Sequence, residues 1–159
     1  MIFNICYYDS PIGMLRIFEN EKGITGIQFV CDPKERLNMV EAKTPLLKEV
    51  IQQLADYFSG KRKEFTLPLD PQGTHFQLRT WNALRDIPYG ETRTYKQIAE
   101  TVGCPKGFRA VGLANNRNPI PVIIPCHRVI GSNGNLTGYA AGLDIKERLL
   151  AIEKNGKDH

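Results

Sequence analysis

The first third of the chain alternates between apolar runs and short polar segments. Residues 2–8, 14–19 and 24–30 are rich in Ile, Phe and Tyr. The segments between them, 9–13 and 20–23, hold Asp, Asn, Ser, Pro and Gly, which are typical turn residues. This pattern predicts strands joined in an antiparallel meander.

A helical pattern follows. Thr44 and Pro45 suit the N-cap and the first helical position. Apolar side chains then recur at helical spacing at Leu47, Val50, Ile51, Leu54, Tyr57 and Phe58. Gly60 is a typical helix terminator. We therefore expect one helix that covers the predicted sheet.

The texture of the sequence changes near residue 70. Residues 61–73 are polar, contain two prolines and a glycine, and read as a linker. A capping box at Thr74 and Gln77 then predicts a helix that ends at about Arg85. Another helix is expected over residues 143–153. We predict a first domain over residues 1–70 and a second, mostly helical one over 71–159.

The second domain contains a helix-turn-helix candidate. A second capping box, Thr94 and Gln97, begins a short helix, residues 103–106 break it, and helical character resumes over 107–116. In the second of these helices, small residues beside Arg109 suit a close approach to a DNA backbone. The pattern alone leaves open a helical hairpin without a ligand.

The segment around Cys126 carries the candidate chemistry. Residues 122–124 read as a short buried strand between prolines, and its end presents Cys126, His127 and Arg128. Neighbouring imidazole and cationic groups favour the nucleophilic thiolate. The alternative is a buried, inert cysteine. Direct contact between Cys126 and His127 requires a turn or a bridging water, since adjacent residues in a strand point to opposite faces.

A carboxylate on the last predicted helix could orient the histidine. Glu153 shares a face with Ile145, Leu149 and Ile152 near the expected C-terminus of that helix. Desolvation and the helix dipole both disfavour its charge there, so it requires a partner, and His127 is a candidate. A solvated terminal residue is the alternative.

Composition adds limits. Of 159 residues, 42% are hydrophobic and 24% charged, as in soluble globular proteins. No apolar run approaches the roughly 18 residues of a membrane span, and no secretory signal is evident, so we expect a cytoplasmic protein. The net charge of +4 permits nucleic-acid binding without demonstrating it. The four cysteines and three histidines form no zinc pattern, and we predict no metal and no cofactor.

Several motifs in the second half resemble the O6-alkylguanine-DNA alkyltransferases. They are Ile87–Gly90, Thr94–Tyr95, Arg109–Gly112, Pro125–Val129, Gly138–Tyr139 and Lys146–Glu153. The resemblance covers about residues 74–153. It implies an α/β protein with an N-terminal ribonuclease-H-like domain and a mostly helical, winged-helix-like domain that carries the helix-turn-helix. It also implies a monomer that acts on double-stranded DNA containing O6-alkylguanine, with O4-methylthymine as a second candidate substrate.

The resemblance implies a role for each catalytic candidate. Cys126 accepts the alkyl group irreversibly and acts once. His127 takes the thiol proton through a water, and Glu153 orients it. Tyr95 rotates the damaged nucleotide out of the duplex and later donates a hydrogen bond to the departing guanine. Asn118 braces the turn that holds the cysteine.

The resemblance also implies binding residues. The main-chain carbonyls of Cys126 and Val129 read the guanine amino group, while Tyr139 and Ala140 line the base pocket. The residues expected to contact DNA are Thr94, Tyr95, Lys96, Arg109, Ala110, Gly112 and Ser132, with Arg109 filling the vacated space. Ala141 stands where many relatives have glycine, and Cys6, Cys31 and His75 do not match the zinc ligands of some relatives.

Three other functions compete with repair. An alkyltransferase-like protein that binds lesions without repairing them carries another residue at the nucleophile position, which Cys126 disfavours. A plain helix-turn-helix regulator leaves Glu153 and the Pro-Cys-His-Arg run unexplained. A cysteine hydrolase lacks an oxyanion-hole motif and a distant second histidine.

Overall fold

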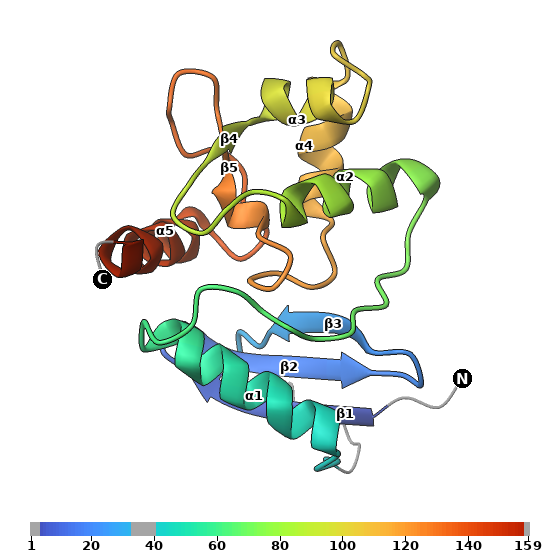
Figure 1. Cartoon of the computed structure of the whole chain (residues 1–159), viewed down its shortest axis with the longest axis vertical. Coiled ribbons are helices and arrows are strands. Elements are labelled where there is room, and N and C mark those ends of the chain that lie inside the picture. Colours follow the sequence, from blue (N-terminus) through green and yellow to red (C-terminus); the bar gives the residue numbers. More distant parts are fainter. Residues whose placement is uncertain (1–3, 33–40, 158–159) are drawn as a thin grey trace. The chain divides into compact units, whose positions relative to one another are not determined.

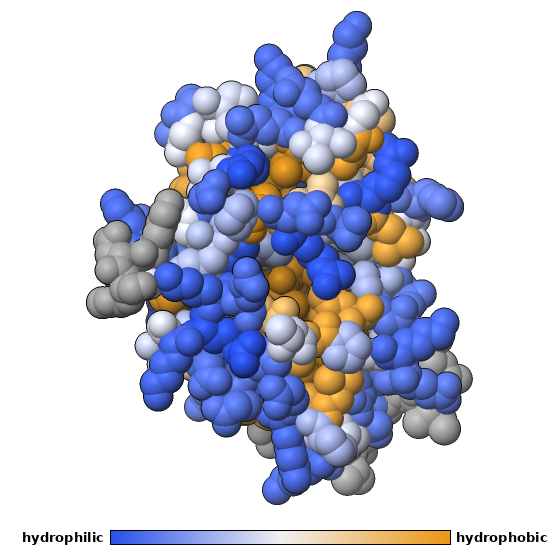
Figure 2. Space-filling model, viewed as in Figure 1, coloured by the Kyte–Doolittle hydropathy of each residue, from blue (hydrophilic) through white to orange (hydrophobic). Residues whose placement is uncertain are grey.

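The computed structural model describes residues 4–32 and 41–157 and divides the chain into two compact units. The first unit ends at Gln72 and the second begins at Gly73 (Figure 1). Figure 2 shows hydrophilic side chains over most of the visible surface, with apolar side chains gathered in smaller patches. Among the described residues, no helix is both long enough and apolar enough to cross a membrane.

The first unit is a sheet covered by one helix, as predicted. Strands β1 (Asn4–Ser10), β2 (Gly13–Glu19) and β3 (Ile24–Phe29) pair antiparallel in that order. The predicted first strand began at residue 2, but residues 2 and 3 lie outside the described part. Helix α1 (Pro45–Phe58) lies across the sheet and buries its apolar stripe (Figure 1).

Local chemistry fixes the ends of α1. The Thr44 side chain accepts a hydrogen bond from the Leu47 N–H at 3.2 Å, which satisfies one of the donors that a helix start leaves free. Pro45 occupies the first turn, where its missing N–H costs nothing. The helix stops at Ser59, and Gly60 follows in the left-handed region with φ of 81°.

The segment predicted as a linker packs against the sheet instead. Leu67 is buried, Leu69 forms a parallel bridge with Ile24, and the Ile24 N–H donates to the Pro68 carbonyl at 2.9 Å. Gly23 permits this approach, because a Cβ there would overlap the Pro68 carbonyl. Pro68 is compatible with this position because it contributes its carbonyl and needs no N–H there, while Asp70 supplies the N–H that bonds the Ile24 carbonyl.

The second unit is mostly helical. It contains α2 (His75–Arg85), α3 (Tyr95–Thr101), α4 (Phe108–Asn116) and α5 (Leu143–Lys157). Both predicted capping boxes are present, at the starts of α2 and α3. The indole N–H of Trp81 donates to the Ala114 carbonyl at 2.8 Å and ties α2 to α4. Strand β4 (Arg93–Thr94) pairs in parallel with β5 (Val129–Ile130).

Two predictions in the second unit are wrong. Residues 122–124 form a turn rather than a strand: Pro121 and Ile124 bridge each other, and Val122 has a φ of 74°. Prolines at positions 119, 121 and 125 remove the donors that a strand ladder requires. Helix α5 continues to Lys157, so Glu153 lies inside the helix and not at its end.

Candidate active site

Cys126 begins a short 3-10 helix, η2 (Cys126–Arg128), directly after the proline-rich turn. Its side chain is buried, with 4% of the residue exposed. Asn118 braces the turn from both sides: its amide donates to the Ile124 carbonyl at 2.7 Å, and its carbonyl accepts from the Ile120 N–H at 3.0 Å. The turn therefore fixes the backbone from which the thiol projects.

The two residues after Cys126 meet Glu153 of α5 in a buried cluster. His127 Nε2 lies 2.5 Å from Glu153 Oε2. The Arg128 guanidinium clamps the same carboxylate, with Nε 2.8 Å from Oε1 and a terminal nitrogen 3.1 Å from Oε2. The other terminal nitrogen of Arg128 donates to the Ile87 carbonyl at 2.6 Å. A buried carboxylate is thus paired on both oxygens, as its burial requires.

These contacts set the protonation of the cluster. Burial alone would raise the pKa of Glu153, but hydrogen bonds and charges from His127 and Arg128 outweigh it and lower the pKa to about 2. Burial lowers the pKa of His127, against the opposing pull of Glu153. At neutral pH, the site therefore holds a carboxylate beside a neutral imidazole.

The free nitrogen of His127 is suited to accept a proton. A carboxylate only accepts hydrogen bonds, so the proton between the two residues sits on His127 Nε2. His127 Nδ1 is then an unprotonated acceptor, and it is buried without a hydrogen-bond partner in the described part of the chain. This arrangement has the properties of a general base held in one tautomer.

The thiol itself is neutral at rest. Burial raises the pKa of Cys126, while hydrogen bonding to Asn118 and Tyr139 and the charge of Lys146 oppose that shift. Burial and the neighbouring Cys126 also raise the pKa of the Tyr139 hydroxyl, so Tyr139 stays protonated. Forming the thiolate therefore requires a base at the moment of reaction.

Lys146 joins the loop after Cys126 to α5. Its Nζ donates to the carbonyls of Val129 at 2.6 Å, Thr137 at 2.9 Å and Gly138 at 3.3 Å. It also lies 5.8 Å from the centre of the Tyr95 ring, and the Tyr95 hydroxyl donates to the Thr137 carbonyl at 2.8 Å. Burial lowers the pKa of Lys146 to about 8. One cation thus fixes the loop that carries the residues predicted to line the base pocket.

Sequence reasoning assigns no role to two residues of this site, Lys146 and Asn115. It expects Arg128 to favour the Cys126 thiolate, but the guanidinium pairs with Glu153 instead. Spacing could have identified Lys146, since Lys146, Leu149 and Glu153 share one face of α5 at i, i+3 and i+7. Asn115, whose amide donates to the Cys126 carbonyl at 3.2 Å, has no local sequence signal because its partner is brought close by the fold.

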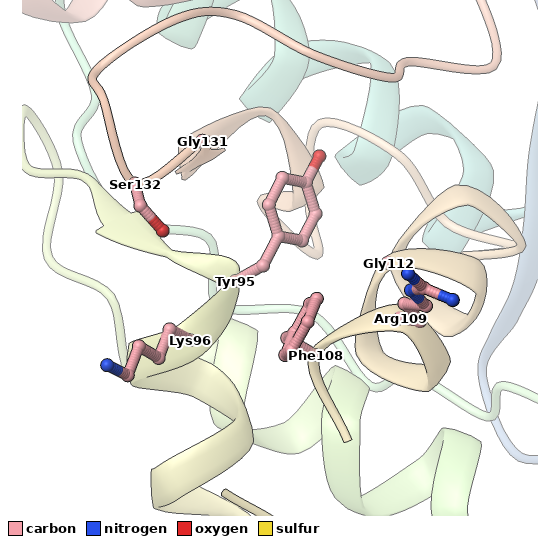
Figure 3. A pocket seen from close by; sticks show the side chains of 7 residues that line it. All are labelled: Tyr95, Lys96, Phe108, Arg109, Gly112, Gly131 and Ser132. Carbon is pink, nitrogen blue, oxygen red and sulfur yellow. The ribbon is translucent and has the colours of Figure 1, made fainter. Parts of the chain in front are cut away.

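Most of the residues predicted to contact DNA line a cavity beside Tyr95, between α3, α4 and the residues that follow β5. A cavity of about 390 Å³ is lined by Tyr95, Lys96, Phe108, Arg109, Gly112, Gly131 and Ser132 (Figure 3). Ala110 is exposed on α4 but is not among the residues that line the cavity. Thr94 is the N-cap of α3, and its hydroxyl oxygen accepts from the Gln97 N–H at 3.1 Å. The lining includes two cationic side chains and no acidic one.

The remaining predicted residues lie in the loop before α5 and in the first unit. Tyr139 is half-buried and Ala140 is exposed. Cys6 is buried in β1, where burial and the nearby Glu41 and Glu19 raise its pKa to about 12, whereas Cys31 is exposed. Within residues 4–32 and 41–157, no three His, Cys, Asp or Glu side chains lie close enough together to hold a metal ion.

Comparison with known proteins gives matches over nearly the whole chain. The family model "6-O-methylguanine DNA methyltransferase, DNA binding domain" matches residues 75–155, and that of the family's ribonuclease-like domain matches residues 5–71. A methylated-DNA–protein-cysteine methyltransferase of Methanosarcina barkeri is 56% identical over 94% of this chain and 98% of its own. The constitutive one of Bacillus subtilis is 51% identical over 92% of each chain. The crystal structure of Mycobacterium tuberculosis OGT in complex with DNA matches with a TM-score of 0.86 and 42% identity, over 97% of this chain and 93% of that one.

Proposed function

Because the chain belongs to the 6-O-methylguanine DNA methyltransferase family, we propose that Cys126 is the residue that accepts the alkyl group. The function of the chain is direct-reversal DNA repair, in which an alkyl group moves from a damaged base to a cysteine of the protein itself. The observation that supports Cys126 is that it is buried at the start of η2, directly before His127 and Arg128, which both pair with Glu153.

In the proposed reaction His127 acts as the base. Its Nδ1 takes the proton of the Cys126 thiol, directly or through one water, while Glu153 holds the ring in the required tautomer. The sulfur then attacks the alkyl carbon on guanine O6 in line with the breaking carbon–oxygen bond. The electron pair of the broken carbon–oxygen bond stays on the guanine, which takes up a proton from water. Tyr95 donates a hydrogen bond to the guanine as it leaves. The charge of Lys146 stabilises the thiolate.

The product explains why the protein acts once. A thioether is not cleaved by water at neutral pH, and no second nucleophile among the residues described around Cys126 is placed to remove the alkyl group. We therefore propose a stoichiometric, irreversible transfer. Asn118 has a positioning role, because its two hydrogen bonds hold the turn before the nucleophile.

The guanine is proposed to bind against the loop after Cys126. Tyr139 and Ala140 form its walls, and the Val129 carbonyl reads the guanine amino group. This carbonyl already accepts one hydrogen bond from Lys146, but a carbonyl oxygen has two lone pairs. The Cys126 carbonyl already accepts hydrogen bonds from both the Asn115 amide and the Val129 N–H. We therefore expect it to bind the guanine amino group more weakly than the Val129 carbonyl does.

The chain binds DNA, and we propose that the duplex lies across α3 and α4. An atom inside a duplex cannot reach a buried thiol, so the nucleotide must first be extruded, at a cost of a few kcal/mol. Tyr95 then rotates the nucleotide and Arg109 fills the vacated space. Ala110 and Gly112 allow close approach, and Thr94, Lys96 and Ser132 contact the backbone. We propose that the protein acts as a monomer in the cytoplasm.

One experiment tests the assignment of Cys126. The protein is incubated with a duplex that contains O6-methylguanine, and its intact mass and modified peptide are measured. We expect one methyl group per protein, on Cys126, and no turnover. Cys126→Ala should bind the duplex without repairing it, whereas Cys104→Ala, a half-buried thiol of the same unit, should repair it normally. Methylation elsewhere, or repair by Cys126→Ala, would contradict the assignment.

A further inference from the structure

The exposed face of α4 carries two large apolar side chains. Phe108 is 48% exposed and Leu113 is 54% exposed. Only Leu78 and Leu143 are comparable among the large hydrophobic residues of the described part of the chain. Single exposed apolar residues are ordinary, but here they lie in two adjacent rows of α4, since Phe108 is one turn from Gly112 and Arg109 is one turn from Leu113. The small-residue face expected from the sequence therefore also has apolar projections.

Phe108 is directed into the cavity beside Tyr95. Figure 3 shows its ring pointing toward Tyr95, between the side chains of Lys96 and Arg109. One turn after Phe108, Gly112 leaves the Tyr95 ring uncovered, since a Cβ at Gly112 would touch that ring at 3.8 Å. The cavity is thus bounded by two aromatic rings and two cations.

The charge and shape of the exposed side of α4 and of the adjoining cavity indicate what kind of partner binds there. No residue of α4 and no residue that lines the cavity is acidic. A partner that carries negative charge next to flat apolar faces fits both the cations and the rings, and DNA bases with their phosphates have that combination. Proteins that bend or open a duplex insert Phe, Leu or similar side chains between base steps.

We propose that Phe108 and Leu113 form an apolar wedge that enters the duplex next to Arg109. Phe108 stacks on the base pair adjacent to the extruded nucleotide. Leu113, five residues later in α4, covers the edges of the neighbouring bases. The wedge replaces part of the base stacking that is lost when the nucleotide leaves, and so favours the extruded state. This inference rests on the proposed function, because it assumes that α4 faces the duplex at the lesion.

Kinetics with two substrates test the wedge. The rate of methyl transfer to Cys126 is measured with O6-methylguanine in a paired duplex and with free O6-methylguanine base, which requires no unstacking. We expect Phe108→Ala to be about tenfold slower on the duplex, the size of one lost base–aromatic stacking contact, and unchanged on the free base. Leu113→Ala should show a smaller effect of the same kind. Phe108→Trp should retain the rate on duplex.

Leu143→Ala is the matched control, because Leu143 is as exposed as Phe108 but lies on α5. It should behave as wild type on both substrates, and thermal unfolding should confirm that all variants are folded. Phe108→Ala that repairs duplex at the wild-type rate, or that is equally slow on the free base, overturns the wedge while the proposed function stands. Wild-type protein that accepts no methyl group from either substrate overturns the proposed function itself.

Discussion

Glu153 links His127, the proposed base, to Arg128. It is 1% exposed, binds His127 and Arg128, and accepts a hydrogen bond from the Gly90 N–H at 3.3 Å. Glu153→Gln removes the charge and leaves the Arg128 guanidinium buried without a counter-ion. We expect alkyl transfer to slow by a factor of about 10² to 10⁴. The free energy of unfolding should fall by about 3–5 kcal/mol. Single-turnover kinetics and urea unfolding measure the two effects.

The control for this substitution is Glu147→Gln on the same helix. Glu147 is exposed, so its replacement should change neither the transfer rate nor the unfolding free energy by a measurable amount. Near-normal transfer by Glu153→Gln would show that His127 does not depend on the carboxylate for its orientation.

The same carboxylate gives a pH dependence of stability. The pKa of Glu153 is about 2 in the folded protein and about 4.3 in an unfolded chain. The unfolded state therefore binds more protons between these values, so stability is fully present above about pH 5 and is lost as pH falls toward 2. We expect the difference in unfolding free energy between wild type and Glu153→Gln to shrink by about 3 kcal/mol over that window. Denaturant titrations at pH 7, 5, 3 and 2 measure it, and a difference that stays constant contradicts it.

Single residues were predictable where a local pattern carries the chemistry. Cys126 followed by His127 and Arg128 stands out in one short run, and Glu153 was identified because a carboxylate on an apolar helix face requires a partner. Asn115 could not be found in this way. Its amide reaches the Cys126 carbonyl only because α4 and η2 pack together, which no spacing along the chain encodes.

At the scale of elements, α5 packs against the loop that ends α2. A Cβ at Gly156 would overlap the Tyr89 hydroxyl, and the Tyr89 ring in turn lies 5.8 Å from the Arg128 guanidinium carbon. Alanine normally stabilises a helix by about 1 kcal/mol over glycine. We expect the opposite for Gly156→Ala, a loss of about 1–3 kcal/mol, because the ring must move away from Arg128. Thermal and urea unfolding measure it.

Two further variants separate packing from helix propensity. Asn155→Ala, at an exposed position next in sequence, should leave stability unchanged or raise it slightly. Combining Gly156→Ala with Tyr89→Phe removes the overlapping hydroxyl and should recover part of the loss, in a double-mutant cycle with a favourable coupling energy. A stabilising Gly156→Ala would contradict the close approach.

Helices whose N-cap residues are recognisable in the sequence were predicted well, and the irregular turn before Cys126 was not. Thr74, Thr94 and Thr44 cap the helices that the sequence predicts at their positions. Residues 122–124 look like a strand because Val and Ile favour strands, but flanking prolines supply no ladder donors and Val122 takes a left-handed φ. The hydrogen bonds of Asn118 to Ile120 and Ile124 hold the turn in place, and no propensity of Val or Ile indicates them.

At the scale of the whole molecule, the predicted α/β class is confirmed: a ribonuclease-like domain precedes a DNA-binding one. Net charge contributed little to this result, because +4 on 159 residues is compatible with many partners. The distribution of charge is more informative, since Lys96 and Arg109 border one cavity whose lining has no acid. Such a distribution is visible only when α3 and α4 are placed side by side.

The ionic contribution of this surface can be measured through salt. Phosphate contacts release counter-ions, so the logarithm of the binding constant for an undamaged duplex should fall linearly with the logarithm of salt concentration. Lys96→Ala should reduce that slope by about 1 and weaken binding to all sequences alike. Lys22→Ala removes the same charge from an exposed turn of the first unit and should leave the slope unchanged. Fluorescence anisotropy at several salt concentrations compares the two variants. Equal slopes for both would mean that net charge attracts the duplex and that Lys96 makes no phosphate contact of its own.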